Sequence, residues 1–265
     1  MTNIHSTAIV SKEAVITNSS YIGPYCIVGK DVKLGKNTRL ISNVTIDGFT
    51  TIGDDCEFFP YSTIGTSPQD LKFNGEKSYL NIGNNNIFRE YVTINPGTKG
   101  GGLITSIGDN CLFMVSSHIA HDCRIGNNVI LVNNASLAGH VIIEDYAILG
   151  AFSGVHQFCR IGKHSMTGAM SGIDSDVIPY GTVLGNRAYL SGLNIIGLKR
   201  RGFSKQIIQE LRKAYGLLFF TQDGTISDRI KEVSEDFSKN EPVMEVVNFL
   251  TKEKSRSICK PKNVG

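Results

Sequence analysis

Apolar residues recur at every sixth position from the start of the chain. The first run contains eleven such positions, none of them polar: Ile4, Val10, Ile16, Ile22, Val28, Leu34, Leu40, Ile46, Ile52, Phe58 and Ile64. Small or β-branched residues lie two positions before the later ten. A strict period of six fits neither the 3.6-residue repeat of a helix nor the two-residue repeat of one long strand. It predicts a short strand and a corner, three times per 18-residue coil, in a parallel β-helix.

The phase of the repeat changes once along the chain. The pattern returns in phase at Ile82, but from Ile107 to Ile173 it runs one residue out of step. Thr167 is the only polar residue in this second run. The slip indicates extra residues inserted between two coils rather than a change of fold.

Two segments break the pattern, and both are candidates for expelled loops. In the first, Asp70 and Glu76 occupy positions where apolar residues belong, and in the second, Gly and Pro are frequent. We therefore predict loops near residues 66–81 and 95–105. Solenoid proteins commonly carry functional residues on such insertions.

Beyond about residue 195 the period of six is lost and helical spacing replaces it. The apolar positions predict helices over Ser204–Phe220, Ser227–Phe237 and Val243–Lys252. We divide the chain into an all-β parallel β-helix, residues 1–195, and a C-terminal helical domain, residues 196–265. Such a domain would cover the unpaired strand edges at the end of the solenoid.

Five of the six cysteines lie in the small inward column: Cys26, Cys56, Cys111, Cys123 and Cys159. This register favours packing as compact apolar side chains over disulfides or metal ligation. The sixth, Cys259, lies outside the repeat.

The overall charge and the hydropathy exclude some classes of partner. The 27 basic and 24 acidic residues give a net charge of +3, too weak to indicate a nucleic-acid partner. No apolar stretch approaches the roughly 20 residues of a membrane span, and the N-terminus does not resemble a signal peptide. We therefore expect a cytoplasmic protein that binds neither nucleic acid nor membrane.

The histidines gather in one part of the chain and avoid the inward columns. Four of the six lie within 39 residues: His118, His121, His140 and His156. With 18 residues per coil, His121 is stacked with Gly139 and then with Gln157. Asp122 is stacked with His140 in the same way. Successive coils are about 4.8 Å apart, so the repeat predicts one small outward-facing surface that holds these side chains.

An imidazole beside a carboxylate is a good general base near neutral pH, because the carboxylate orients the ring and stabilises its protonated form. His121 and Asp122 fit these two roles. Gly139, stacked over the base, could offer its N–H to a developing oxyanion. The alternative is a zinc site, because His-x-x-His with a third histidine also suits that metal.

The hexapeptide pattern resembles that of the hexapeptide-repeat acyltransferases, which implies left-handed coils and trimers. Five motifs together resemble the acyl-carrier-protein-dependent UDP-N-acetylglucosamine O-acyltransferases of lipid A synthesis: His118–Cys123, Leu137–His140, Val155–Phe158, Gln69–Lys72 and Gly197–Phe203. The resemblance extends over nearly the whole chain. It implies transfer of a 3-hydroxyacyl group from acyl carrier protein to the 3-hydroxyl of UDP-N-acetylglucosamine, without a cofactor or a metal.

The resemblance also implies roles for individual residues. His121 would be the general base, Asp122 its orienting partner and Gly139 the oxyanion donor. The sugar nucleotide would be held by Asp70, Lys72, His118, His140, His156 and Gln157. The uridine and phosphate end would be held by Asn194, Arg200 and Arg201. Without the resemblance, the basic run Lys199–Arg201 is equally typical of a solvated charge cluster.

The sequence departs from the family pattern at Ile196, where the family has an acidic residue. Ala169 and Met170 lie near the segment that bounds the acyl tail in the family, and bulk there favours a shorter chain. Both a 3-hydroxyl sugar and its 3-amino analogue fit the acceptor.

Three other functions fit the same fold. An acetyl-CoA-dependent hexapeptide acetyltransferase would use the same base. A zinc-dependent enzyme like the carbonic anhydrases of this shape would use the histidines as ligands. A solenoid that only binds partners would need neither.

Overall fold

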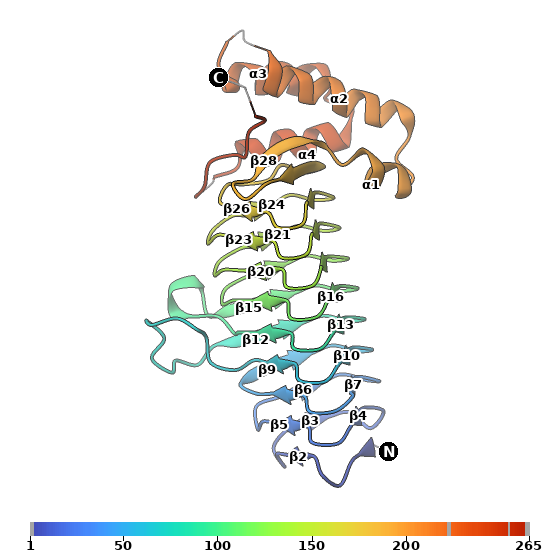
Figure 1. Ribbon diagram of the computed structural model, residues 1–265, viewed down its shortest axis with the longest axis vertical. Coiled ribbons are helices and arrows are strands. Elements are labelled where there is room, and N and C mark those ends of the chain that lie inside the picture. Colours follow the sequence, from blue (N-terminus) through green and yellow to red (C-terminus); the bar gives the residue numbers. More distant parts are fainter. Residues whose placement is uncertain (1–2, 222–223, 254, 263–265) are drawn as a thin grey trace.

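The computed structural model describes residues 3–221, 224–253 and 255–262. Most of the chain forms a column of stacked coils, with three short strands and three corners per coil, and helices lie at one end (Figure 1). Strands of successive coils pair in parallel into three sheets that run along the column. The predicted parallel β-helix is confirmed.

The strands belong to three sheets. Sheet A contains β1 (Asn3–Ile4), β4 (Tyr21–Ile22), β7 (Arg39–Leu40), β10 (Glu57–Phe58), β13 (Ile87–Phe88), β16 (Leu112–Phe113), β19 (Ile130–Leu131), β22 (Ile148–Leu149), β25 (Met166–Thr167), β27 (Gly181–Leu184) and β28 (Tyr189–Leu193). Sheet B contains β2 (Ile9–Val10), β5 (Ile27–Val28), β8 (Thr45–Ile46), β11 (Thr63–Ile64), β14 (Thr93–Ile94), β17 (His118–Ile119), β20 (Ser136–Leu137), β23 (Gly154–Val155) and β26 (Gly172–Ile173). Sheet C contains β3 (Val15–Ile16), β6 (Lys33–Leu34), β9 (Phe49–Ile52), β12 (Tyr79–Ile82), β15 (Ile104–Ile107), β18 (Arg124–Ile125), β21 (Ile142–Ile143) and β24 (Arg160–Ile161).

The strand register explains both the return of the repeat and its slip. In an uninterrupted coil, Ile125 is paired with Ile143, eighteen positions later. Ile52 is paired with Ile82, thirty positions later, so the first insertion adds twelve residues, a multiple of six. Ile82 is paired with Ile107, twenty-five positions later, so the second insertion adds seven. The odd residue shifts the phase by one while the strands stay paired.

Both insertions leave the column on the same side as loops (Figure 1). The loops span residues 65–78 and 95–103, so both predictions extended too far. Both predicted loops end too late for the same reason: β12 and β15 are four residues long rather than two, so they begin earlier than the repeat predicts. The loops are joined to each other where the Lys99 N–H donates to Glu76 Oε1 over 3.0 Å.

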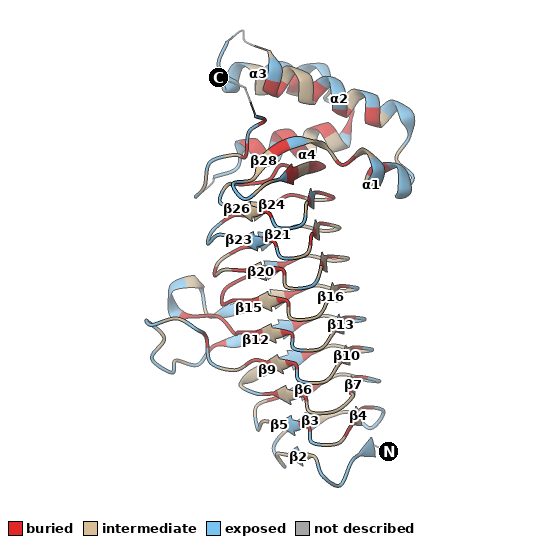
Figure 2. Cartoon of the chain, viewed as in Figure 1, coloured by how far each residue is buried: buried red, intermediate tan, exposed pale blue. Residues whose placement is uncertain are grey.

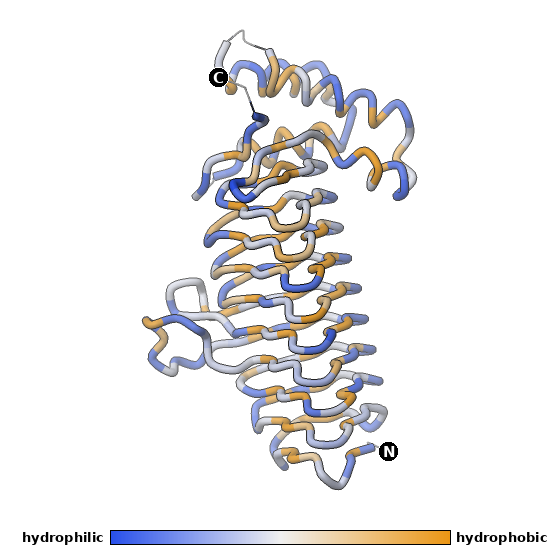
Figure 3. The backbone as a smooth tube through the Cα atoms, viewed as in Figure 1, coloured by the Kyte–Doolittle hydropathy of each residue, from blue (hydrophilic) through white to orange (hydrophobic). Residues whose placement is uncertain are grey.

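The predicted inward columns form the core along the axis of the column (Figures 2 and 3). Apolar positions of the repeat are buried from Ile22 onward, whereas Ile4 in the first coil is 44% exposed because no coil covers it. All six cysteines are buried and free, as the inward register predicted for five. Burial raises the pKa of the Cys123 thiol to about 12, so this thiol is a packing group.

The three predicted helices are confirmed as α2 (Lys205–Phe220), α3 (Ile226–Asp236) and α4 (Glu241–Thr251). Helix α4 begins two residues earlier than predicted, because the Asn240 side chain caps it and a proline lies in its first turn. The short helix α1 (Ile195–Arg200) and the antiparallel β27–β28 hairpin were not predicted. No helix in the described residues is long and apolar enough to cross a membrane.

The helices close the C-terminal end of the column, as the sequence predicted. On α4, Glu245 forms an ion pair with Lys163 over 2.6 Å and accepts a hydrogen bond from the Tyr180 hydroxyl. The Arg160 guanidinium lies 4.3 Å from the centre of the Phe249 ring. These contacts join α4 to the last coils. A separate helical domain with a boundary at residues 195/196 stays a prediction.

One corner of the column carries a stack of rings between sheets C and A. His164 is stacked between Tyr146 and Tyr180, with ring centres 4.6 and 5.5 Å away. Burial, with the nearby Arg201 and Lys163 cations, lowers the pKa of His164 to about 4. Its Nδ1 has no hydrogen-bond partner among the described residues. His164 is therefore a packing group that is stable only when neutral.

We expect His164 to weaken the fold in acid. The unfolded chain binds a proton near the ordinary histidine pKa of 6.5, so the free energy of unfolding falls as the pH drops from about 6.5 toward 4. His164→Phe keeps the stacking and removes the proton-binding group. Urea unfolding at pH 7.5 and 5 should show a smaller loss for the variant than for the unaltered protein. An equal loss would contradict this role.

Candidate active site

His121 and Asp122 lie at the corner between β17 and β18, where sheet B passes into sheet C. Asp122 has a left-handed backbone conformation, with φ of 60°. The repeat predicted that both side chains point away from the core, and accordingly His121 lines a groove and Asp122 contacts Thr98 of the 95–103 loop. They are nevertheless buried, at 7% and 5% exposure, because the 95–103 loop covers the corner.

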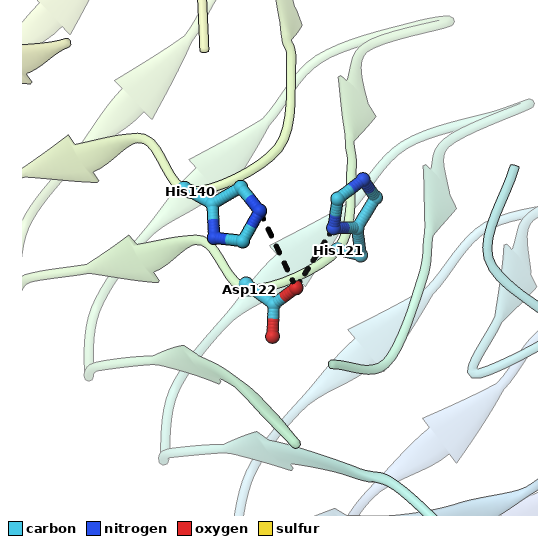
Figure 4. Close-up of side chains that lie close together, drawn as sticks. All are labelled: His121, Asp122 and His140. Atoms are coloured by element: carbon cyan, nitrogen blue, oxygen red, sulfur yellow. Dashed lines mark hydrogen bonds and ion pairs between the residues drawn. The ribbon is translucent and has the colours of Figure 1, made fainter. Parts of the chain in front are cut away.

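The Asp122 carboxylate accepts three hydrogen bonds inside this cover. Its Oδ1 accepts from the Thr98 N–H over 2.9 Å. Its Oδ2 accepts from the Thr98 hydroxyl over 2.6 Å and from His121 Nδ1 over 2.8 Å, the latter drawn in Figure 4. A Cβ on Gly101 would lie 2.0 Å from Asp122 Cγ, so only glycine permits this close approach. The loop therefore holds the carboxylate in one orientation.

This hydrogen bonding selects one form of His121. A carboxylate only accepts hydrogen bonds, so Nδ1 of His121 carries the proton and Nε2 keeps a free lone pair. The ring lies against Gly139, where a Cβ would be 2.4 Å from His121 Cε1. Glycine at 139 is therefore needed for the ring to occupy this place. His121 has the arrangement of a general base.

The N–H of Gly139 is free to bind a ligand. None of the described residues accepts a hydrogen bond from it. Pro24 and Pro60 occupy the same position in other corners, directly before a residue with positive φ. Since proline has no N–H, the fold does not need this donor. Beside His121, it can donate to a reacting oxygen.

Two further histidines surround the pair. His140 Nε2 lies 3.9 Å from Asp122 Oδ2, and its ring stacks on Phe158 with centres 4.5 Å apart (Figure 4 shows His140). His118 Nδ1 lies 2.7 Å from the Thr93 hydroxyl. Burial lowers the pKa of both His118 and His140. Both rings are therefore neutral near pH 7 and offer hydrogen bonds rather than charge.

His118, His121 and Gly139 open onto a groove of about 720 Å³ along sheet B. Its outward-facing floor is Ser136, Gly154 and Gly172, and a Cβ on Gly154 would meet nothing within 4 Å. Among the predicted site residues, the groove is lined by His118, His121, Gly139, His156 and Gln157. The bare floor leaves room for an extended ligand beside the base.

The first loop reaches the rim of the same groove. Gln69 lines the groove. Burial is the largest influence on the pKa of His140 and lowers it, whereas the negative charge of Asp70 acts in the opposite direction. The Lys72 N–H donates to Asp70 Oδ1 over 3.0 Å, which turns the loop tightly at this point. Asp70 is half-buried and Lys72 is exposed.

Three predicted residues lie elsewhere in the chain. Arg201 donates to the Tyr146 carbonyl over 3.1 Å, at the corner between sheets C and A, and Arg200 is exposed at the end of α1. Asn194 is buried and caps α1, accepting from the Gly197 N–H and donating to the His164 carbonyl. Sheet C separates this corner from that of His121. A single chain does not bring the two groups together.

Sequence reasoning missed two residues of the site. Thr98 lies in the second insertion, and the phase slip was a signal that this segment is special. Arg256 donates to His156 Nδ1 and to the Gln157 carbonyl from the C-terminal segment. No sequence signal connects it to histidines a hundred positions earlier.

The arrangement also bears on the metal alternative. Ligand atoms of His121, Asp122 and His140 lie within 4.8 Å of one another, a spacing that a metal ion could use. However, Asp122 Oδ2 already accepts two hydrogen bonds, and one of them occupies His121 Nδ1. A metal between these atoms would have to break that bond. The hydrogen bond between His121 and Asp122 thus competes with metal binding at this cluster.

Another cavity, of about 510 Å³, lies between sheet C and α4. It is lined by charged residues of both signs, including Arg124, Lys163 and Glu245, and by none of the predicted site residues. The predicted site residues that line a cavity therefore line the sheet B groove.

Comparison with known proteins agrees with this fold. Residues 104–139 match the family model of the bacterial transferase hexapeptide, six repeats, and residues 176–259 match domain 2 of UDP-N-acetylglucosamine O-acyltransferase. The chain is thus similar to hexapeptide-repeat transferases.

A curated relative gives the more specific match. The acyl-[acyl-carrier-protein]–UDP-N-acetylglucosamine O-acyltransferase of Thermodesulfovibrio yellowstonii is 47% identical over 98% of this chain and 100% of its own length. The solved structure of LpxA from Acinetobacter baumannii has a TM-score of 0.90 and 41% identity, over 97% of this chain and 99% of that one. The Francisella novicida UDP-N-acetylglucosamine acyltransferase has a TM-score of 0.92 and 38% identity, over 98% and 95%. This chain belongs to the family of acyl-[acyl-carrier-protein]–UDP-N-acetylglucosamine O-acyltransferases.

Thr98→Val removes one donor to the buried carboxylate and keeps the backbone N–H. A hydrogen bond to a charged group contributes about 1.5–3 kcal/mol, so the 95–103 loop should open more often. Amide hydrogen exchange of this loop should become roughly ten-fold faster or more, and Thr98→Ser should restore it. In the control, Thr50→Val, the lost hydroxyl donates to the Asp47 carbonyl, and exchange of the loop should not change. Unchanged exchange in Thr98→Val would show that the hydroxyl does not hold the loop.

Proposed function

We propose that this chain is the O-acyltransferase that begins lipid A biosynthesis. It transfers a 3-hydroxyacyl group from acyl carrier protein to the 3-hydroxyl of UDP-N-acetylglucosamine. The observation that carries the proposal is the His121–Asp122 pair beside the free Gly139 N–H, on the wall of an open groove. Membership of the acyltransferase family supports the same conclusion. The proposed reaction uses no cofactor and no metal.

His121 Nε2 would remove the proton of the sugar hydroxyl as its oxygen attacks the thioester carbonyl. The carbonyl oxygen becomes negative and accepts a hydrogen bond from Gly139 N–H. The tetrahedral intermediate then collapses, the C–S bond breaks, and His121 returns the proton to the sulfur of the carrier. Asp122 stabilises the protonated imidazole between the two transfers. The products are the acylated sugar nucleotide and free carrier thiol.

We assign binding of the sugar nucleotide to Asp70, Lys72, His118, His140, His156 and Gln157. The uridine and phosphate end would be held by Arg200 and Arg201 of a neighbouring subunit, with Asn194 holding α1 in place as its cap. Support for a second subunit comes from the position of the two corners within one chain, on either side of sheet C. Ile196 is exposed on α1, so any contact that it makes with the uracil ring of the ligand is apolar.

We infer that the assembly is a homotrimer of left-handed coils, as the hexapeptide pattern implies. Sheet A supports association, because it carries a column of aliphatic side chains on its outward face: Ile87, Leu112, Ile130, Ile148 and Met166. Ile87 and Met166 are 39% and 38% exposed in the single chain. A continuous apolar stripe of this kind is typical of an interface.

Six buried free thiols accord with the reducing cytoplasm as the location.

His121→Ala should almost abolish product formation, because it removes the ring that is hydrogen-bonded to Asp122. The assay is incubation with UDP-N-acetylglucosamine and a series of 3-hydroxyacyl carrier proteins, with the product detected by mass. General bases contribute about 10²–10⁴-fold, so kcat should fall by at least two orders of magnitude. His5→Ala is the matched control, because that exposed ring is hydrogen-bonded only to Thr7 among the described residues. Equal loss in both variants would contradict the role of His121.

The same assay separates the alternatives. Transfer from acetyl-CoA but not from acyl carrier protein would indicate a coenzyme A-dependent acetyltransferase. Loss of activity in a chelator, restored by zinc, would favour the metal reading of the His121, Asp122 and His140 cluster. A 3-amino sugar nucleotide, offered in parallel, identifies the acceptor.

Ile148→Glu should break the proposed trimer. It places a charge in the middle of the outward-facing apolar column of sheet A, where burial in an interface would be costly. Sedimentation should show a trimer for the unaltered protein and smaller species for the variant. The control is Thr51→Glu, on the exposed outward face of sheet C. A monomer before any substitution would overturn the inference.

A further inference from the structure

The C-terminal segment returns to the last coils and is firmly attached there. The Asp176 N–H donates to the Ser257 carbonyl over 2.7 Å, and the Cys259 N–H donates to the Asp176 carbonyl over 2.8 Å. The Leu190 N–H donates to the Lys260 carbonyl over 2.9 Å. Cys259 is buried. Arg256 is therefore presented to the column by an anchored segment.

Arg256 contacts two neighbouring residues of the groove. Its Nη2 lies 2.7 Å from His156 Nδ1, and its Nε donates to the Gln157 carbonyl over 2.9 Å. A guanidinium has five donors and no acceptor, and it stays charged in proteins. His156 Nδ1 must therefore be the acceptor. The proton of the neutral ring is on Nε2.

The opposite form of His156 would have a partner as well. Its Nδ1 lies 3.3 Å from the Gln157 carbonyl, to which an Nδ1–H could donate. In that form Nε2 would be a bare acceptor. Arg256 occupies both the Nδ1 lone pair and the Gln157 carbonyl, so it decides between the two forms.

We propose that Arg256 is a positioning residue of the groove, which holds His156 as an Nε2–H donor for an acceptor oxygen of the ligand, such as a carbonyl or phosphate oxygen. The form of the ring follows from the contacts alone, whereas the identity of the ligand rests on the proposed function. The C-terminal segment thereby becomes part of the site. Arg256 itself acts through His156.

The first test reads the form of His156 without any substrate. Protein labelled with ¹⁵N in its histidines is studied by NMR, and the His156 signals are assigned by their loss in His156→Gln. The unaltered protein should show Nε2–H. In Arg256→Ala the proton should move to Nδ1, where the Gln157 carbonyl accepts it. Arg256→Lys, which can still donate to Nδ1, should keep Nε2–H.

The second test measures turnover of UDP-N-acetylglucosamine with 3-hydroxyacyl carrier protein. A lost hydrogen bond to the ligand should raise KM for the sugar nucleotide about ten-fold in Arg256→Ala. kcat should change much less, because His121 and Gly139 are untouched, and Arg256→Lys should recover most of the affinity. Lys260→Ala, on the same segment, removes one positive charge as the matched control and should behave like the unaltered protein.

The outcomes separate the two proposals. Nδ1–H in the unaltered protein, or an unchanged ring in Arg256→Ala, would overturn the role of Arg256 whatever the enzyme does. A correct ring form with no turnover in the unaltered protein would overturn the proposed function alone. A thermal unfolding midpoint that falls equally in Arg256→Ala and Lys260→Ala, with equal loss of affinity, would show a structural role and overturn the positioning role.

Discussion

Backbone hydrogen bonds between successive coils are the constraint on which the rest of this structure depends. At the corner that carries the site, the Ala120 N–H donates to the Leu137 carbonyl, and the Ala138 N–H to the Val155 carbonyl, over 3.1 and 3.0 Å. In an uninterrupted coil the ladder places each residue against the one eighteen positions later. His121 therefore meets Gly139 as a matter of register. Both residues stand on a rigid wall, so their relative position needs no loop to close.

The insertions add what a regular solenoid cannot supply. A corner side chain on a bare column would be open to water, and its hydrogen bonds would compete with the solvent. The 95–103 loop covers Asp122 with Thr98 and Gly101, and the drier surroundings strengthen each bond in the cluster. Because the strands on either side remain paired, the loop could be added without disturbing the core.

The two groups of polar residues lie on separate corners, so one chain alone does not bring them together. The corner between sheets B and C has the His121–Asp122 pair and the open groove, whereas the corner between sheets C and A has Arg201 beside Tyr146. A sugar nucleotide needs both chemistries. A symmetric assembly would supply them at each interface, since every subunit carries one copy of each corner.

The sequence by itself determined the solenoid, its inward columns and the stacking of His121 with Gly139, because a six-residue period leaves each side chain one direction. It also predicted the three long helices, whose apolar spacing is local. The predicted ends of the loops were wrong, because β12 and β15 are four residues long rather than two. The burial of Asp122, the part of Thr98 and the reach of Arg256 were decided only by the tertiary structure. An insertion lies outside the six-residue repeat, so the repeat does not predict its side-chain directions. A contact between residues a hundred positions apart produces no periodic pattern in the sequence.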